Sequence, residues 1–168
     1  MRTAEGFLFM KHITCVIDKC LGCRSCVLAC AVEHSRSKQL VEALREPVMP
    51  QPRIRVELID DKGQTLRSRT ISLQCRHCEN PVCVQACISG GIFRDAMTGD
   101  VRITPEKCVG CWSCVMVCPF GAIVRHESLH RAMKCDLCPD RDTPACVDAC
   151  PTGALVYGER EEAGAVTS

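Results

Sequence analysis

The cysteines of this chain follow a spacing that suits the binding of a compact metal group. The 168-residue sequence holds 17 cysteines, and all but one fall into four groups of four. Groups one and three share the spacing C-x2-C-x2-C-x3-C, whereas the middle gap widens to four residues in group two and to seven in group four. In chain order the groups are Cys20, Cys23, Cys26 and Cys30; Cys75, Cys78, Cys83 and Cys87; Cys108, Cys111, Cys114 and Cys118; and Cys135, Cys138, Cys146 and Cys150.

This spacing favours clusters of four irons and four sulfides. A C-x2-C-x2-C loop wraps around a small object and directs three thiolates to three of its corners, while the fourth cysteine, on the helical turn that follows, points elsewhere. In the bacterial ferredoxin run C-x2-C-x2-C-x3-C-P, that fourth cysteine ligates the other cluster of a pair. Pro119 and Pro151 complete the run in groups three and four. The sixteen thiols therefore predict four 4Fe-4S clusters as cofactors.

Zinc and disulfides explain the spacing less well. Zinc sites usually use two C-x2-C knuckles separated by a dozen or more residues, with four ligands on one ion. A C-x2-C-x2-C loop also crowds its thiols too closely for unstrained disulfides. A zinc-stabilised interaction module is therefore a remote alternative.

The cysteine groups lie in an internal repeat that short strands and turns must position. IDKCLGCRSCVLAC matches PEKCVGCWSCVMVC, and NPVCVQAC matches TPACVDAC. A strand, a turn at Thr98-Gly99-Asp100 and a second strand are expected between groups two and three. That hairpin favours groups two and three as an inner pair enclosed by groups one and four, although spacing alone also permits pairing one with two and three with four.

The longest segment without cysteine, residues 31–74, is expected to form an insert. SKQLVEALRE predicts a helix that ends before Pro47, and RIRVELID and TLRSRTISL predict a hairpin around Asp61-Lys62-Gly63. The predicted fold class is α+β, with two interlocked bacterial-type ferredoxin folds and this helix and hairpin insert. The expected parts are an outer half (10–30 with 119–157), the insert (31–74), an inner half (75–118) and a flexible or partner-docking tail (158–168).

The repeat array over residues 12–157 resembles the four-cluster iron-sulfur subunits of the dimethyl sulfoxide reductase and formate dehydrogenase type. CAVEHS, CPFGAI and RDTPAC are most similar to the ferredoxin-like subunit that accompanies carbon monoxide dehydrogenase, and similar subunits serve hydrogenases and tungsten aldehyde oxidoreductases. The resemblance implies two outer clusters and two inner ones. The outer ligand sets are Cys20, Cys23, Cys26 with Cys150 and Cys135, Cys138, Cys146 with Cys30; the inner sets are Cys75, Cys78, Cys83 with Cys118 and Cys108, Cys111, Cys114 with Cys87.

Several other residues near the cysteines have expected roles. Trp112, the only tryptophan, replaces no ligand and is expected to pack beside its cluster and shield it from water. His77 is expected to bond to sulfur or to be exposed, and Cys15 to be a small buried hydrophobe on the strand HITCVID. Four clusters would add about −8 to the formal charge of +1. Basic residues near the ligands are expected to offset that charge: Lys19, Arg24, Arg76, Lys107, Lys134 and Arg141.

The remaining features exclude several classes of function. The N-terminus has an apolar stretch of only five residues, and no apolar run approaches the roughly 18 residues that span a membrane, so a cytoplasmic location is expected. The near-neutral charge does not indicate a nucleic-acid partner. A nucleophile and base pair, a phosphate loop and a nucleotide fingerprint are all missing from the sequence, so the chain is not expected to be an enzyme.

These observations predict an electron-transfer subunit of anaerobic metabolism. It would relay single electrons between a catalytic subunit and a downstream acceptor subunit. The family resemblance implies that the catalytic partner is a nickel, molybdenum or tungsten enzyme, such as carbon monoxide dehydrogenase or an aldehyde or formate oxidoreductase. A free polyferredoxin-type carrier is the alternative, and head-to-tail self-association of copies into a filament is a further possibility.

Overall fold

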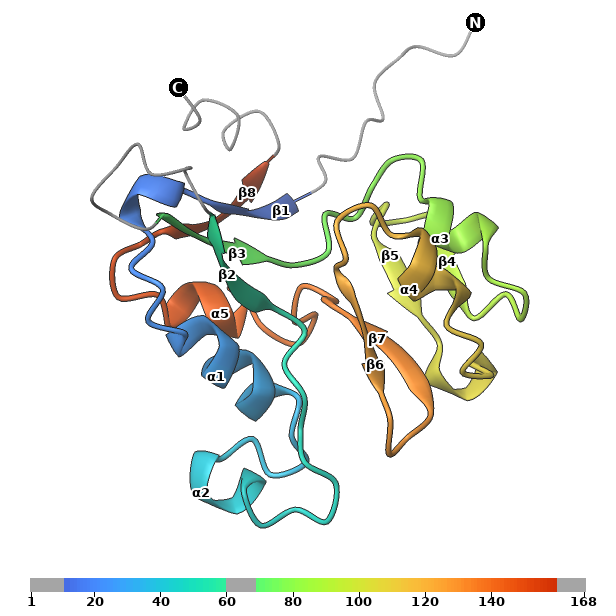
Figure 1. Ribbon diagram of the computed structural model, residues 1–168, viewed down its shortest axis with the longest axis horizontal. Coiled ribbons are helices and arrows are strands. Elements are labelled where there is room, and N and C mark those ends of the chain that lie inside the picture. The colour runs from blue at the N-terminus through green and yellow to red at the C-terminus, as the bar shows by residue number, and fades with distance from the viewer. Residues whose placement is uncertain (1–10, 60–68, 160–168) are drawn as a thin grey trace, which may run out of the picture.

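The computed structural model describes residues 11–59 and 69–159, which form short helices around four two-stranded antiparallel sheets. The sheets pair β1 (Lys11–Cys15) with β8 (Leu155–Glu159), β2 (Arg55–Ile59) with β3 (Arg69–Leu73), β4 (Ile92–Arg94) with β5 (Val101–Ile103), and β6 (Ile123–His126) with β7 (Arg131–Lys134). The α+β class expected from the sequence is confirmed, and the sheets divide between two halves (Figure 1).

The outer half joins the two ends of the described chain. Strand β1 pairs with β8, and helix α1 (Ser25–Glu33) packs against α5 (Ala145–Asp148). Ile13, Ile54 and Leu155 share one apolar core with several cysteines. Groups one and four of the cysteines therefore belong to the same half, on the blue and red side of Figure 1.

The inner half consists of helices α3 (Val82–Gln85) and α4 (Ser113–Val117) with two hairpins. Its core contains Val101 of β5, Ile123 of β6 and Ala132 of β7. The predicted hairpin between groups two and three is present as β4 and β5, and Gly99 in its turn has a φ of +75°. The expected outer half began at residue 119, but 123–134 packs with the inner half because β6 follows α4 directly and buries its apolar side against that core.

The insert covers the outer half and touches the inner one. The predicted hairpin is confirmed as β2 and β3, although its turn at Asp61-Lys62-Gly63 lies outside the described residues. The Thr70 hydroxyl donates a hydrogen bond to the carbonyl of Cys20 (3.0 Å), and the Arg55 guanidinium donates one to the carbonyl of Gly121. The hairpin therefore ties the two halves together.

The helix predicted in the insert is much shorter than expected. Helix α2 covers only Leu40–Ala43, and Ala43 is its one buried residue. Leu40, Val41 and Leu44 are all exposed. Because Ala43 is the one residue of α2 that packs into the described chain, the segment has few of the tertiary contacts that stabilise longer helices in water.

The loops of groups one and three turn through left-handed backbone. Gly22 and Gly110 have φ values of +67° and +68°, and a Cβ at Gly110 would lie 2.6 Å from the carbonyl oxygen of His130. The residues that cap α1 and α4, Arg24 and Trp112, also have positive φ (62° and 63°). The 3-10 helices η1 (Ile17–Lys19) and η2 (Pro105–Lys107) precede these loops. Within residues 11–59 and 69–159, no helix has the length and apolar character needed to cross a membrane.

Candidate iron-sulfur sites

The structure brings the fourth cysteine of group four to the first three cysteines of group one. Cys20, Cys23, Cys26 and Cys150 line one cavity, together with residues of β1 and β8. Burial raises the pKa of Cys26 to about 11, and the neighbouring thiols of Cys23, Cys150 and Cys20 shift it in the same direction. The four thiols are therefore close enough to interact electrostatically.

The fourth cysteine of group one, in turn, joins the first three cysteines of group four, at a more buried position in the outer half. Cys135, Cys138, Cys146 and Cys30 are all buried. Burial raises the pKa of Cys146, and the thiols of Cys135, Cys30 and Cys138 raise it further. The backbone N–H of Arg53, from the insert, donates to the Sγ of Cys30 over 3.2 Å. The insert thus contributes to this quartet directly.

In the inner half, group three is joined by a cysteine of group two. Cys108, Cys111, Cys114 and Cys87 line a second cavity. Burial raises the pKa of Cys114 to about 11, and Cys108, Cys111 and Cys87 add to the increase. Backbone N–H groups of Ala132 and Ile92 lie 3.4 Å from the Sγ atoms of Cys108 and Cys87, respectively, and donate to them.

The fourth quartet takes its last thiol from group three. Burial raises the pKa of Cys83 to about 11, and the thiols of Cys75, Cys118 and Cys78 shift it in the same direction. The Sγ of Cys118 accepts the N–H of Ala122, and the Sγ of Cys75 accepts the N–H of His77, each over 3.4 Å. All sixteen predicted ligand residues are thus gathered into four quartets.

The chemistry of these quartets fits 4Fe-4S clusters. Every cysteine in the described residues is a free thiol, including all sixteen in the quartets. Several sulfurs accept backbone N–H groups, which stabilise a thiolate bound to iron. Burial, and after it the neighbouring thiols, raise the pKa of the buried members, so a positive charge such as iron favours their deprotonation. Each quartet could hold one cluster.

The structure shows the surroundings of Trp112, Cys15 and His77, whose roles were predicted from the sequence. Trp112 lines the cavity of the Cys108 quartet and packs edge-on against His130, with 5.5 Å between ring centroids. Cys15 ends strand β1 and is half-buried beside Cys20. His77 bonds to sulfur through its backbone N–H, which donates to Cys75 Sγ (3.4 Å), but its side chain is fully buried rather than exposed, and Nδ1 accepts the N–H of Val101 (3.2 Å). Packing of β5 over the group-two loop buries this imidazole.

The basic residues expected near the ligands differ greatly in their surroundings. The Arg76 guanidinium stacks on the ring of Phe120, and Arg141 pairs with Glu33 and Asp148 at the surface. Lys19, Arg24 and Lys107 are exposed, whereas Lys134 is buried. Only Lys134 among them is enclosed by protein.

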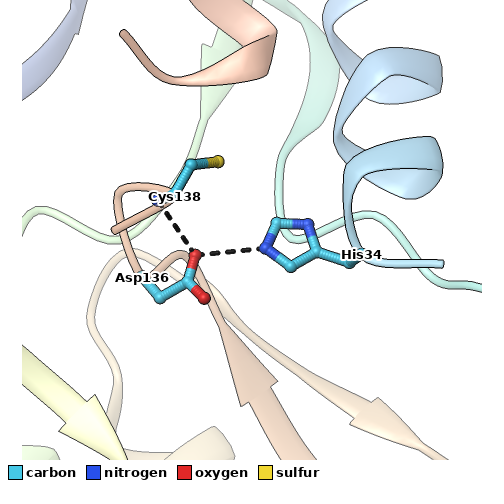
Figure 2. Close-up of side chains that lie close together, drawn as sticks. All are labelled: His34, Asp136 and Cys138. Carbon is cyan, nitrogen blue, oxygen red and sulfur yellow. Dashed lines mark hydrogen bonds and ion pairs between the residues drawn. The ribbon is translucent and has the colours of Figure 1, made fainter. Parts of the chain in front are cut away.

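The sequence interpretation missed a polar network around the buried outer quartet (Figure 2). Asp136 accepts hydrogen bonds from His34 Nε2 (3.1 Å) and from the backbone N–H of Cys138 (3.2 Å), and it pairs with Arg53. Potential metal-binding atoms of His34, Asp136 and Cys138 lie within 4.8 Å of one another. Because the carboxylate already has three partners and the thiol belongs to a quartet, we interpret the group as support for that quartet. Its signal in the sequence was an aspartate between two ligands and a histidine four residues after a third.

Comparison with known protein families agrees with this geometry. A model described as a 4Fe-4S dicluster domain matches residues 66–160, and a second, described as a 4Fe-4S binding domain, matches residues 17–33. The chain belongs to the 4Fe-4S dicluster domain family. The two matches together include all four cysteine groups, and residues 34–65, between groups one and two, lie outside both matches.

Several curated relatives of this chain have names that agree with iron-sulfur binding or electron transport. An iron-sulfur protein of Rhodospirillum rubrum is 42% identical over 154 residues, which cover 82% of this chain and 76% of that protein. The electron transport protein HydN of Escherichia coli K12 is 36% identical over 168 residues and 90% of each chain. Protein NrfC of the same strain is 32% identical over 152 residues, 85% of this chain and 62% of NrfC.

Among solved structures, this chain is similar to a chain of the active-site complex BamBC of benzoyl coenzyme A reductase. The two chains are 27% identical, the TM-score is 0.45, and the match covers 90% of this chain and 80% of that one.

Proposed function

We propose that this protein binds four 4Fe-4S clusters and transfers single electrons as a non-catalytic subunit of an oxidoreductase complex. The observation that carries the proposal is the gathering of sixteen cysteines, from four distant groups, into four separate quartets. When bound, such clusters supply one-electron redox chemistry. The protein's own groups hold them through thiolates, donate N–H groups to the sulfurs and limit access of water.

The ligand sets in this proposal exchange one cysteine within each half. The outer sets are Cys20, Cys23, Cys26 with Cys150 and Cys135, Cys138, Cys146 with Cys30. The inner sets are Cys75, Cys78, Cys83 with Cys118 and Cys108, Cys111, Cys114 with Cys87. Each half would then be a two-cluster ferredoxin unit, and the two units would interlock through the insert and β7.

The exposure of the cysteines supports a relay with two ends. Cys23 and Cys111 are exposed, and they belong to quartets in different halves. All four cysteines of the Cys30 and Cys135 quartet are buried. Electrons would enter at one exposed quartet and leave at the other.

The proposed partner is a catalytic metalloenzyme subunit. The resemblance noted in the sequence favours carbon monoxide dehydrogenase, followed by molybdenum or tungsten enzymes acting on formate or aldehydes, and then hydrogenase. A relative named as an electron transport protein is consistent with a carrier that has no substrate site of its own.

The first test is to purify the protein without oxygen and measure its metals. About sixteen irons and sixteen sulfides per chain are expected, with zinc near zero. Well under sixteen irons after reconstitution would count against four clusters, and about four zinc ions per chain would favour the zinc module.

The second test identifies the partner. An anaerobic pull-down of the untagged native complex, with metals quantified in the eluate, distinguishes the candidates. Iron with nickel indicates carbon monoxide dehydrogenase or hydrogenase, and iron with molybdenum or tungsten indicates a formate or aldehyde enzyme. Iron alone would favour a free electron carrier.

A further inference from the structure

One lysine of the repeat is buried where its counterparts are exposed. Lys19, Lys107 and Lys134 each precede the first cysteine of their group. Lys19 and Lys107 are exposed, whereas Lys134 is 3% exposed. At the same position of group two the chain has Gln74, which is buried but neutral. The repeat therefore places an ammonium inside the protein at one site only among these four.

Lys134 lies where the two halves meet. It is the last residue of β7, from which the chain crosses from the inner half to α5 in the outer half (Figure 1). Its Nζ donates hydrogen bonds to the carbonyl of Val101, in the inner core, and to the carbonyl of Cys135 (2.6 Å), in the outer quartet. The ammonium thus bonds to backbone of both halves.

Lys134 lies beside cysteines of two different quartets. Its Nζ donates to the carbonyl of Cys135, a member of the buried outer quartet. Its other acceptor, the carbonyl of Val101, belongs to the inner core against which Cys83 and Cys118 pack. The ammonium therefore bonds to backbone next to both an outer and an inner proposed cluster.

In the described parts of the chain, no carboxylate oxygen lies within 4.0 Å of Lys134 Nζ. The buried imidazole of His77 is neutral or cationic, so it supplies no negative charge either. A buried ammonium without an ionic partner is costly unless another negative group lies nearby. The flanking quartets would hold such negative groups, because a cluster ligated by four thiolates carries a net negative charge.

We propose that Lys134 sets the reduction potentials of the two clusters that flank it, those of the Cys118 and Cys30 quartets, and so stabilises an electron at the junction of the two halves. This inference rests on the proposed function, because it requires clusters in both quartets. Reduction of a cluster by an external donor adds one electron and one negative charge, with no bond made or broken. A fixed positive charge nearby stabilises the reduced form more than the oxidised form and raises the potential.

The test compares neutral substitutions at three equivalent positions. Lys134→Gln introduces the residue type that the repeat has at position 74, keeps a hydrogen-bond donor and removes the charge. The matched controls are Lys19→Gln and Lys107→Gln, whose side chains are exposed. Each purified protein is loaded with clusters, assayed for iron and sulfide, and titrated with dithionite under EPR observation.

In Lys134→Gln, two of the four midpoint potentials should fall by about 59 mV each. This shift corresponds to a roughly tenfold decrease in the equilibrium constant for one-electron reduction. Both controls should leave all four potentials close to those of the unaltered protein, because exposed charges are screened. Unchanged potentials in a fully loaded Lys134→Gln protein would overturn the proposal, as would equal shifts in the controls.

Two further results separate the possible failures. If Lys134→Gln does not load, Lys134→Met, which keeps a long unbranched side chain, takes its place. If neither neutral variant retains its iron, Lys134 is a residue required for folding and the proposal is overturned. Fewer than four clusters in the unaltered protein would instead refute the proposed function, and that result is read from the iron assay before any potential is measured.

Discussion

The imidazole of His34 lies 3.1 Å from the carboxylate of Asp136, although 102 residues separate the two in the chain. His34 Nδ1 also lies 2.7 Å from the carbonyl oxygen of Cys30, so the ring joins the end of α1 to the loop that contains Cys135 and Cys138 (Figure 2). Both ring nitrogens face groups that accept hydrogen bonds, which fits an imidazolium. Although its burial acts against this, hydrogen bonds to Asp136 and Cys30 raise the pKa of His34 to about 9.

Removing the charge of Asp136 should loosen the buried outer quartet. Asp136→Asn would leave the partly buried His34 and Arg53 without a carboxylate, a loss of about 1 kcal/mol after allowance for solvent screening. We expect clusters to be lost several-fold faster in guanidinium chloride, followed anaerobically by visible absorbance. Asp140→Asn is the control, because Asp140 is an exposed carboxylate two residues after Cys138. Equal rates in both variants would show that the network does not support the site.

Substitution of one ligand should cost iron, while substitution of a neighbouring cysteine should not. Cys150 and Cys15 line the same cavity, but only Cys150 belongs to the proposed ligand set. Cys150→Ser should lower the iron content by up to about four atoms per chain or yield a three-iron cluster visible by EPR. Cys15→Ser should retain the full iron content. If Cys15→Ser loses as much iron as Cys150→Ser, Cys15 has to be added to the ligands.

A side chain at Gly110 should be far more damaging than one at Gly90. Both residues have positive φ, but a Cβ at Gly110 would meet the carbonyl of His130, whereas a Cβ at Gly90 would have nothing within 4 Å. Gly90→Ala should cost about 1 kcal/mol of backbone strain, and Gly110→Ala about 3 kcal/mol or more. At one fixed scan rate, each kcal/mol should lower the temperature of cluster loss by about 2–4 °C. Similar temperatures for the two variants would contradict the close approach at His130.

Trp112 should protect its quartet from oxidation. Group one has Arg24 at the same position of the repeat, with nearly the same backbone φ (62° against 63°), so Trp112→Arg requires no change in the backbone. The variant should load normally but lose one cluster several-fold faster in air, because the apolar indole no longer covers the cavity. Absorbance decay in air-saturated buffer measures the rate. The reciprocal variant Arg24→Trp serves as a control and should not accelerate the loss; an unchanged rate in Trp112→Arg would limit the indole to a packing role.

The sequence by itself determined the chemistry of this protein, because cluster ligation depends on local features. Three thiols within one loop, the turn residues that shape the loop and the strands beside it are all set by neighbours along the chain. The hairpins β2–β3 and β4–β5 were predicted correctly for this reason, and the 4Fe-4S family followed from the cysteine spacing.

Only the tertiary structure decided which distant groups meet. Spacing left the pairing of the four groups open, and the packing of α1 on α5 and of α3 on α4 brings each fourth thiol to its quartet. The sequence also did not predict that the side chains of His77 and Lys134 are buried, because burial depends on the layer that packs over a side chain rather than on its neighbours in sequence. Helix α2 is short for the same reason, since its sequence favours a helix but its large apolar residues Leu40 and Val41 stay exposed.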